Sequence, residues 1–179
     1  MPTTSKKIGD SERRSMEEIT IAKAQLPDTI EELSQFVLIG REKLIALKSA
    51  IKACTKSEVV AEKVRQMKED EQGLAEAVLL GETKIGELLK EVPKAHNRFD
   101  RADSGVLSTK KKELGISDKQ AQRYQILARH QDLVEEAIQE AKDSDRAVTR
   151  QDVLNKVRGA FYPHLSDEEL LEKLAEEAI

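Results

Sequence analysis

The chain has 179 residues, of which 36% are charged, 39% apolar and only 3% aromatic. So few aromatic residues argue against an antiparallel β protein, and a single cysteine, Cys54, excludes a disulfide scaffold. No apolar run approaches the roughly 18 residues that a membrane span needs. The start of the chain has no apolar stretch typical of a secretory signal. Abundant Glu, Lys, Leu, Ala and Gln with few Gly and Pro predict an all-α fold.

The formal net charge of −4 is an average over unlike segments. Residues 94–129 hold nine basic and four acidic side chains, a net charge of +5. Residues 166–179 hold one basic and six acidic side chains, a net charge of −5. A basic block inside an acidic chain is a reason to look for a nucleic-acid surface within that block.

In chain order, residues 1–28 are polar and weakly patterned, and we expect a flexible N-terminal arm. Thr29 followed by Glu32 is typical of a capping box, and apolar residues recur at helical spacing from there to about residue 53. A second helical pattern begins after Ser57 and continues to about residue 91. The sequence therefore predicts a long, coiled-coil-like helical hairpin over residues 29–93, which is a candidate dimerisation module.

Pro93 ends the hairpin, and the polar residues 94–104 are expected to form a basic linker. Shorter helices are predicted over 106–114, 118–129, 132–142, 150–157 and 167–178, with Ser104, Ser117, Gln131, Thr149 and Ser166 as their caps. This arrangement predicts a compact domain over residues 105–158, followed by an acidic C-terminal helix over residues 159–179. The apolar stripe of that last helix (Leu170, Leu171, Leu174 and Ala178) predicts that it docks on the body of the protein or on a partner.

The most informative segment is LSTKKKELGISDKQAQRYQILAR, residues 107–129. Gly115 stands where a left-handed backbone conformation is needed between two helices. Ser117 and Gln120 are typical of a capping box at the start of the second helix. These features predict a helix, a tight turn and a second helix.

The two faces of the second predicted helix differ in character. Ala121 and Tyr124, with Leu127 or Ala128, fall on one face and predict a packing surface in which small Ala121 lets two helices cross closely. The opposite face is polar and basic. Such a tightly crossed pair that presents one polar helix is the pattern of a helix-turn-helix, here over residues 107–129 of a DNA-binding domain that spans residues 105–158.

A helix-turn-helix places its second helix in the major groove, where Arg pairs with guanine and Gln with adenine. The predicted groove contacts are Lys119, Gln120, Gln122 and Arg123. The predicted phosphate contacts, which add affinity without reading sequence, are Lys110, Lys111, Lys112, Arg98 and Arg101. The alternative for the same pattern is an ordinary helical hairpin with a solvated polar face.

The segment also resembles the helix-turn-helix of ParB/KorB-type DNA-binding proteins. The resemblance is carried by Leu114-Gly115-Ile116-Ser117 and by Leu127-Ala128. More broadly, residues 29–157 resemble small phage and mobile-element proteins through KIGELLKEVPKA (84–95), LGISDKQAQRYQILA (114–128) and VTRQDVLNKV (148–157). The resemblance implies sequence-directed binding of double-stranded DNA in a regulatory, replication or partition role.

Other chemistry is not expected. His96, His130 and His164 lie far apart and have no partner at metal-ligand spacing, so we expect neither a metal nor a cofactor. No phosphate-binding loop or nucleophile motif is present, and we do not expect an enzyme. We also expect no room for the α/β nucleotide-binding domain that precedes the helix-turn-helix in true ParB proteins.

DNA binding as a homodimer is the expected function, because one recognition helix reads few base pairs. We expect a cytoplasmic protein that lies on the nucleoid when bound to DNA. The alternative is a helical protein–protein adaptor that acts on a phage or host factor. In that case the helix-turn-helix would be inert.

Overall fold

A computed structural model of the protein describes residues 26–56, 61–91, 111–163, 165, 166, 169 and 173. The elements in this part of the chain are α2 (Ile30–Lys56), α3 (Ala61–Glu91), α5 (Asp118–Arg129), α6 (Gln131–Asp143) and α7 (Arg150–Phe161). The described residues contain helices and no strand, so the predicted all-α fold is confirmed. Among these helices, none has a stretch both long enough and apolar enough to cross a membrane.

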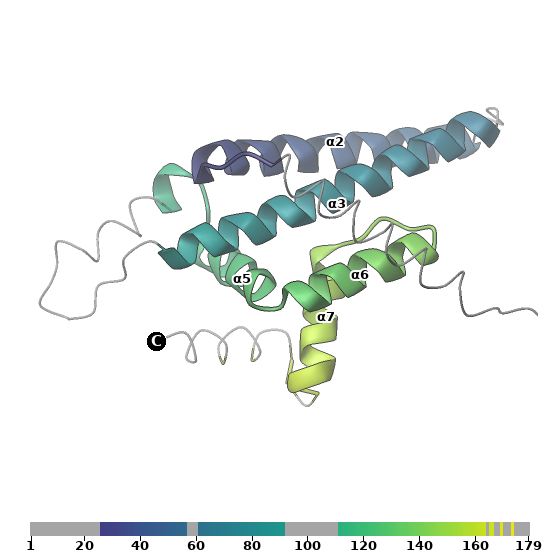
Figure 1. Cartoon of the computed structure of the whole chain (residues 1–179). Coiled ribbons are helices and arrows are strands. Elements are labelled where there is room, and N and C mark those ends of the chain that lie inside the picture. Colours follow the sequence, from purple (N-terminus) through teal and green to yellow (C-terminus); the bar gives the residue numbers. More distant parts are fainter. Residues whose placement is uncertain are drawn as a thin grey trace, which may run out of the picture.

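Helices α2 and α3 form the predicted hairpin and run side by side along the length of the molecule (Figure 1). The hairpin begins at a capping interaction, in which the Glu32 N–H donates to Thr29 Oγ1 over 3.2 Å. The Thr29 hydroxyl in turn donates to Glu32 Oε2 over 2.9 Å. Leu33 and Val37 of α2 are buried against α3, where Leu80 is also buried. Apolar periodicity on two neighbouring helices was therefore sufficient to predict the pair.

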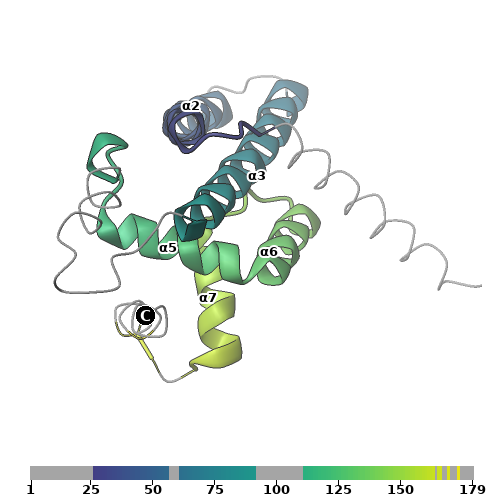
Figure 2. The ribbon, with the colours of Figure 1, turned by 60° about the vertical axis from the view of Figure 1, so that its left-hand side comes forward.

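The shorter helices lie along one side of α3, and α5 lies across the last turns of α3 (Figure 2). Gly86 of α3 makes this crossing possible. A β-carbon at position 86 would overlap the carbonyl of Tyr124 and would approach the Ala128 β-carbon to 3.0 Å. The two backbones therefore touch with no side chain between them. Ala121, the small residue predicted at a close helix crossing, is buried on α5, and Gly86 on α3 is a second small residue that the sequence prediction did not include.

The buried apolar side chains form one continuous core that extends from the hairpin to α7. Its largest fully buried members are Leu33, Leu80, Ile85, Leu89, Leu127, Ile138, Val134, Val153 and Val157. Because α5 packs on α3 at one side and on α6 and α7 at the other, it is the central helix of this core. The orientation of α5 is therefore set by the whole fold.

Most element boundaries agree with the sequence prediction. Helix α5 has the predicted bounds, and α7 begins as predicted at Arg150 but continues past residue 157 to Phe161. The prediction of Gln131 as a cap is wrong. His130 precedes α6 and also ends α5, with φ −121 and no side-chain capping bond. A single residue, His130, thus separates the two helices, which leaves no room for a separate cap.

Three predicted segments lie wholly or mainly outside the described residues. They are the N-terminal arm, the linker with most of the helix that follows it, and most of the acidic C-terminal helix.

Two glycines of α3 provide a matched test of the close crossing. Gly86→Ala is expected to destabilise the protein by about 3 kcal/mol, the upper part of the range for overpacking, because the added methyl meets backbone atoms. Gly73→Ala meets nothing within 4 Å and is expected to stabilise the protein by about 1 kcal/mol, as Ala does in a helix interior. Urea unfolding followed by circular dichroism measures both. Equal effects of the two changes would contradict the proposed crossing.

Candidate nucleic-acid interface

The tight turn before α5 has the predicted geometry. Gly115 has φ +65, a left-handed conformation that glycine adopts without steric cost. The Ile116 N–H donates to the Lys111 carbonyl over 2.9 Å, and the Gly115 N–H donates to the Lys112 carbonyl over 3.2 Å. These two bonds satisfy carbonyls at the end of the preceding helical turn. The Ile116 side chain is buried and anchors the turn to the core.

The start of α5 is held by the predicted capping box. The Gln120 N–H donates to Ser117 Oγ over 3.2 Å, and the Ser117 N–H donates to Gln120 Oε1 over 2.9 Å. Both bonds satisfy donors that would otherwise have no partner at a helix N-terminus. The residue at which α5 begins is therefore fixed by local hydrogen bonds.

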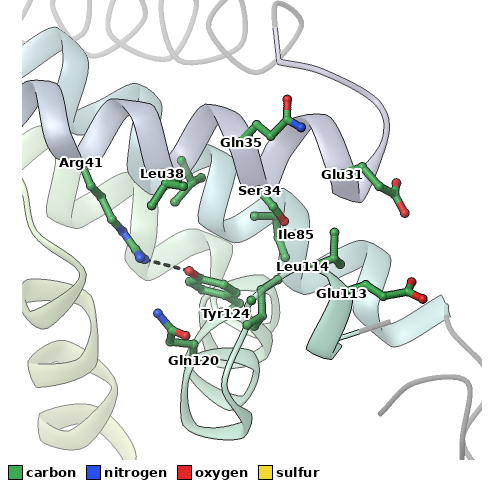
Figure 3. Close-up of a pocket in the computed structure, with 13 residues that line it drawn as sticks. Glu31, Ser34, Gln35, Leu38, Arg41, Ile85, Glu113, Leu114, Gln120 and Tyr124 are labelled. Atoms are coloured by element: carbon green, nitrogen blue, oxygen red, sulfur yellow. Dashed lines mark hydrogen bonds between the residues drawn. The ribbon is translucent and has the colours of Figure 1, made fainter. Parts of the chain in front are cut away.

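The inner face of α5 is the predicted packing face, with Ala121, Tyr124, Leu127 and Ala128 all buried. Tyr124 also enters a polar cluster beneath α2. Its hydroxyl accepts a hydrogen bond from Arg41 Nη2 over 2.7 Å (Figure 3). Arg41 donates to Glu82 Oε1 from Nε over 3.1 Å and from Nη2 over 2.5 Å. The recognition helix of the prediction is thus tied to both helices of the hairpin.

A second arginine completes the cluster from α7. Arg150 Nε lies 3.2 Å from Glu82 Oε2, and the Glu82 side chain is only 4% exposed. The guanidinium carbons of Arg41 and Arg150 lie 5.9 Å and 5.7 Å from the centroid of the Tyr124 ring, a distance typical of cation–π contacts. Burial, and then the charge of Glu82, raises the pKa of Tyr124 above its ordinary value of 10.0. The hydroxyl therefore stays protonated.

We refer to Arg41, Glu82, Tyr124 and Arg150 as the Glu82 cluster. Sequence reasoning placed Tyr124 on a packing face but missed its partners, because they come from three helices that are distant in the chain. One sequence feature could have indicated the cluster: Glu82 lies between Leu80 and Ile85, in the most apolar part of α3. A carboxylate in that position needs a cationic partner.

The outer face of α5 carries a polar stripe. Asp118, Gln122, Gln125 and Arg129 recur at helical spacing, with Lys119 beside them. Asp118, Lys119 and Arg129 are exposed, and the two glutamines are half-buried. The stripe extends over the whole length of the helix. Gln125 and Arg129 were not among the predicted contacts, although their spacing from Gln122 and Asp118 could have identified them.

The structure separates the four predicted groove contacts. Lys119 and Gln122 belong to the outer stripe. Gln120 is half-buried, its amide is part of the capping box, and it faces the space under α2 (Figure 3). Arg123 is half-buried, and its Nε is shielded from solvent. The capping role of Gln120 was visible in the sequence and competes with a role in base contact.

The predicted phosphate contacts fall into two groups. Lys111 forms an ion pair with Asp118 over 2.8 Å, and Lys112 is exposed. The remaining three, Lys110, Arg98 and Arg101, lie outside the described residues.

A second basic group, which sequence reasoning missed, lies at the other end of α5. Burial lowers the pKa of Lys90, and the nearby charge of Arg129 lowers it further. Burial also lowers the pKa of His130, the charge of Asp132 raises it, and the charges of Arg129 and Lys90 lower it by smaller amounts. These groups therefore lie near one another, although Lys90 is in the last turn of α3 whereas Arg129 and His130 lie at the C-terminal end of α5. Glu87 raises the pKa of Lys90, so carboxylates as well as cations lie close to this group.

No cluster of metal ligands occurs within the described residues. Comparison of the chain with known protein families, with curated proteins and with solved structures found no match. The outer stripe of α5, its tight turn and the adjacent cations are the observations from which function can be argued.

The Glu82 cluster makes a graded prediction for stability. Glu82→Gln leaves two partly buried guanidinium groups without a counter-charge and is expected to cost about 3 kcal/mol. Tyr124→Phe keeps the ring and removes only one charge-assisted hydrogen bond, so it is expected to cost about 1.5 kcal/mol. Chemical denaturation of the two variants measures this order. If Tyr124→Phe lost more stability than Glu82→Gln, the central role of Glu82 would be contradicted.

His130 makes a prediction for pH. Its pKa lies below the ordinary value of 6.5 in the folded protein, so the unfolded chain binds a proton first as pH falls. The contribution of His130 to the free energy of unfolding is therefore complete above pH 6.5 and decreases below it. His130→Gln is expected to unfold with a shallower pH dependence between pH 7.5 and the folded pKa. If the free energy of unfolding, measured by urea titration at each pH, depended on pH identically in both proteins, this assignment would be contradicted.

Proposed function

We propose that the chain binds double-stranded DNA in a sequence-directed manner through α5, in a regulatory, replication or partition role of a phage or mobile element. The observation that supports this best is the division of α5 into two faces. Its inner face is locked to the hairpin by Tyr124 and Gly86, and its outer face is a continuous polar stripe. A rigid helix with one polar face beside a tight turn suits the major groove.

The side chains of the outer stripe have the chemistry of base recognition. The amides of Gln122 and Gln125 can donate to and accept from adenine, while Lys119 and Arg129 can donate to guanine. Asp118 at the first turn is paired with Lys111, so its charge is balanced before DNA approaches. The stripe therefore offers donors and acceptors along two to three helical turns.

Charge around α5 also suits DNA. Residues 111–130 hold five basic and two acidic side chains, a net charge of +3, in a chain whose total is −4. Lys112 is exposed near the start of α5, and Lys90 is exposed near its end. Cations at both ends of a recognition helix can contact the backbone on both sides of the groove. A homodimer held by the hairpin would add a second α5 and double the length of sequence that is read.

A protein–protein adaptor is the second candidate. It is favoured by three large apolar side chains that α2 exposes, Leu38 at 61%, Ile39 at 53% and Ile45 at 60%. Apolar side chains gathered on one helix are typical of an interaction surface. This surface does not compete with α5, so one chain can serve both functions.

Fluorescence anisotropy with duplexes enriched from a random-sequence pool tests DNA binding. Lys119→Ala combined with Gln122→Ala is expected to weaken binding to the enriched sequence by at least about tenfold, because base contacts are lost. Lys112→Ala is expected to weaken all duplexes alike and to lower the slope of log affinity against log salt by about 1.

Lys63→Ala is the matched control. Lys63 is an exposed lysine at the start of α3, ~35 Å along the helix from Gly86, and its loss is expected to leave affinity unchanged. Absence of binding to any duplex at about 50 mM salt, where phosphate contacts are strong, would overturn the proposal and favour the adaptor.

A further inference from the structure

Two hollows lie along one face of α2. The first is a cavity of about 380 Å³ between α2 and the turn before α5, and it includes Leu38, Arg41 and Leu114 (Figure 3). The second, of about 340 Å³, lies between α2 and the start of α7, and it includes Arg41, Ile45 and Arg150. Arg41 separates the hollows and lines both of them.

The spacing of the hollows matches the repeat of a helix. Leu38 and Ile45, at their rims, are seven residues apart, which is ~10 Å along α2. Both side chains are about 60% exposed. Grooves that bind an amphipathic helix receive apolar anchors at positions i, i+3 or i+4, and i+7. A guest helix lying along α2 would place residues i and i+7 in the two hollows.

The two hollows differ in charge, because Glu31 and Glu113 line the first beside Arg41, whereas cations predominate in the second. The acidic end of a guest would therefore lie at the second hollow. Arg41, Lys48 and Arg150 line it, and Glu82 is the one carboxylate among its lining residues. Arg150 Nη1 is shielded from solvent and has no hydrogen-bond partner within the described residues. Lys48 is 55% exposed and lies 3.8 Å from Glu71. Arg41 and Arg150 share the single carboxylate of Glu82, so this end of the groove has an excess of positive charge beside an exposed apolar side chain.

We propose that the groove binds residues 166–179 of a second copy of this chain. That segment, SDEELLEKLAEEAI, has a net charge of −5 and an apolar stripe at helical spacing. Leu171 and Ala178 are seven residues apart, which matches the two hollows. Its densest acidic run is Asp167–Glu169, and that run would face the cations of the second hollow.

The geometry of a single chain points to exchange between two copies. Lys173 Nζ lies 5.1 Å from the centroid of the Tyr162 ring, beyond the C-terminal end of α7. The second hollow lies at Arg150, the first residue of α7, ~18 Å away along that helix. Lys173, which belongs to this segment, therefore lies at the far end of α7 from the groove of its own chain. Reciprocal exchange between two copies would give a closed two-fold dimer.

This proposal deepens the proposed function, because it supplies the dimer that would carry two α5 helices. Its test contains no DNA, so the two proposals can fail separately. Sedimentation velocity of the full chain is expected to show a concentration-dependent dimer. Adding an excess of the synthetic peptide of residues 166–179 is expected to convert the dimer to monomers, because the peptide occupies both grooves.

Two isoleucines of α2 provide the matched control. Ile45→Glu, in the second hollow, and Lys48→Glu are each expected to weaken the dimer by at least about tenfold, the effect of one lost contact worth 1.4 kcal/mol. Ile39→Glu changes an equally exposed side chain that lines neither hollow and is expected to leave the dimer intact. Circular dichroism checks that each variant is folded.

Three outcomes would overturn the proposal. One is a dimer that persists unchanged in Ile45→Glu, which would place the interface elsewhere on the hairpin. Another is an equal loss of dimer affinity in Ile39→Glu and Ile45→Glu, which would indicate a nonspecific apolar contact. The third is a monomeric full chain that does not bind the fluorescently labelled peptide.

Discussion

The carboxylate of Glu82 determines how the helices of this protein are arranged. It is almost fully buried and is paired with Arg41 of α2 and Arg150 of α7, because a carboxylate is tolerated in the interior only with compensating charge. The two guanidinium groups flank the ring of Tyr124 on α5. One charged group on α3 thus fixes the positions of three other helices. Removal of the Glu82 charge would leave two arginines that repel each other, so the stability of the whole cluster depends on this carboxylate.

Gly86 complements this cluster, because it determines the distance between α3 and α5, whereas Tyr124 determines the rotation of α5. With no side chain between the two backbones, α5 has little freedom to slide or turn. The polar stripe on its outer face is consequently held in one orientation. Binding groups held by rigid secondary structure lose less entropy on association than groups on mobile loops.

Local signals in the sequence predicted local structure well. The Ser117–Gln120 capping box and the left-handed Gly115 were read correctly, because both depend only on residues within a few positions. The Glu82 cluster could not be derived in this way, since its members meet only after the hairpin and the shorter helices have packed. The same limit applies to Lys90 and Arg129. Gln120 shows a different limit, because one side chain matched two patterns and the structure assigns it to the cap.

Arg41 links the two proposed interfaces. Its Nη2 holds the hydroxyl of Tyr124 on α5, and its side chain, 27% exposed, lines both hollows of the groove on α2. An acidic helix in that groove would form an ion pair with the same guanidinium group that donates hydrogen bonds to Glu82 and Tyr124. Occupation of the groove would therefore act directly on the cluster that orients α5. In the proposed dimer, the guest segment and the Tyr124 hydroxyl of the DNA-reading helix would therefore share this single guanidinium group.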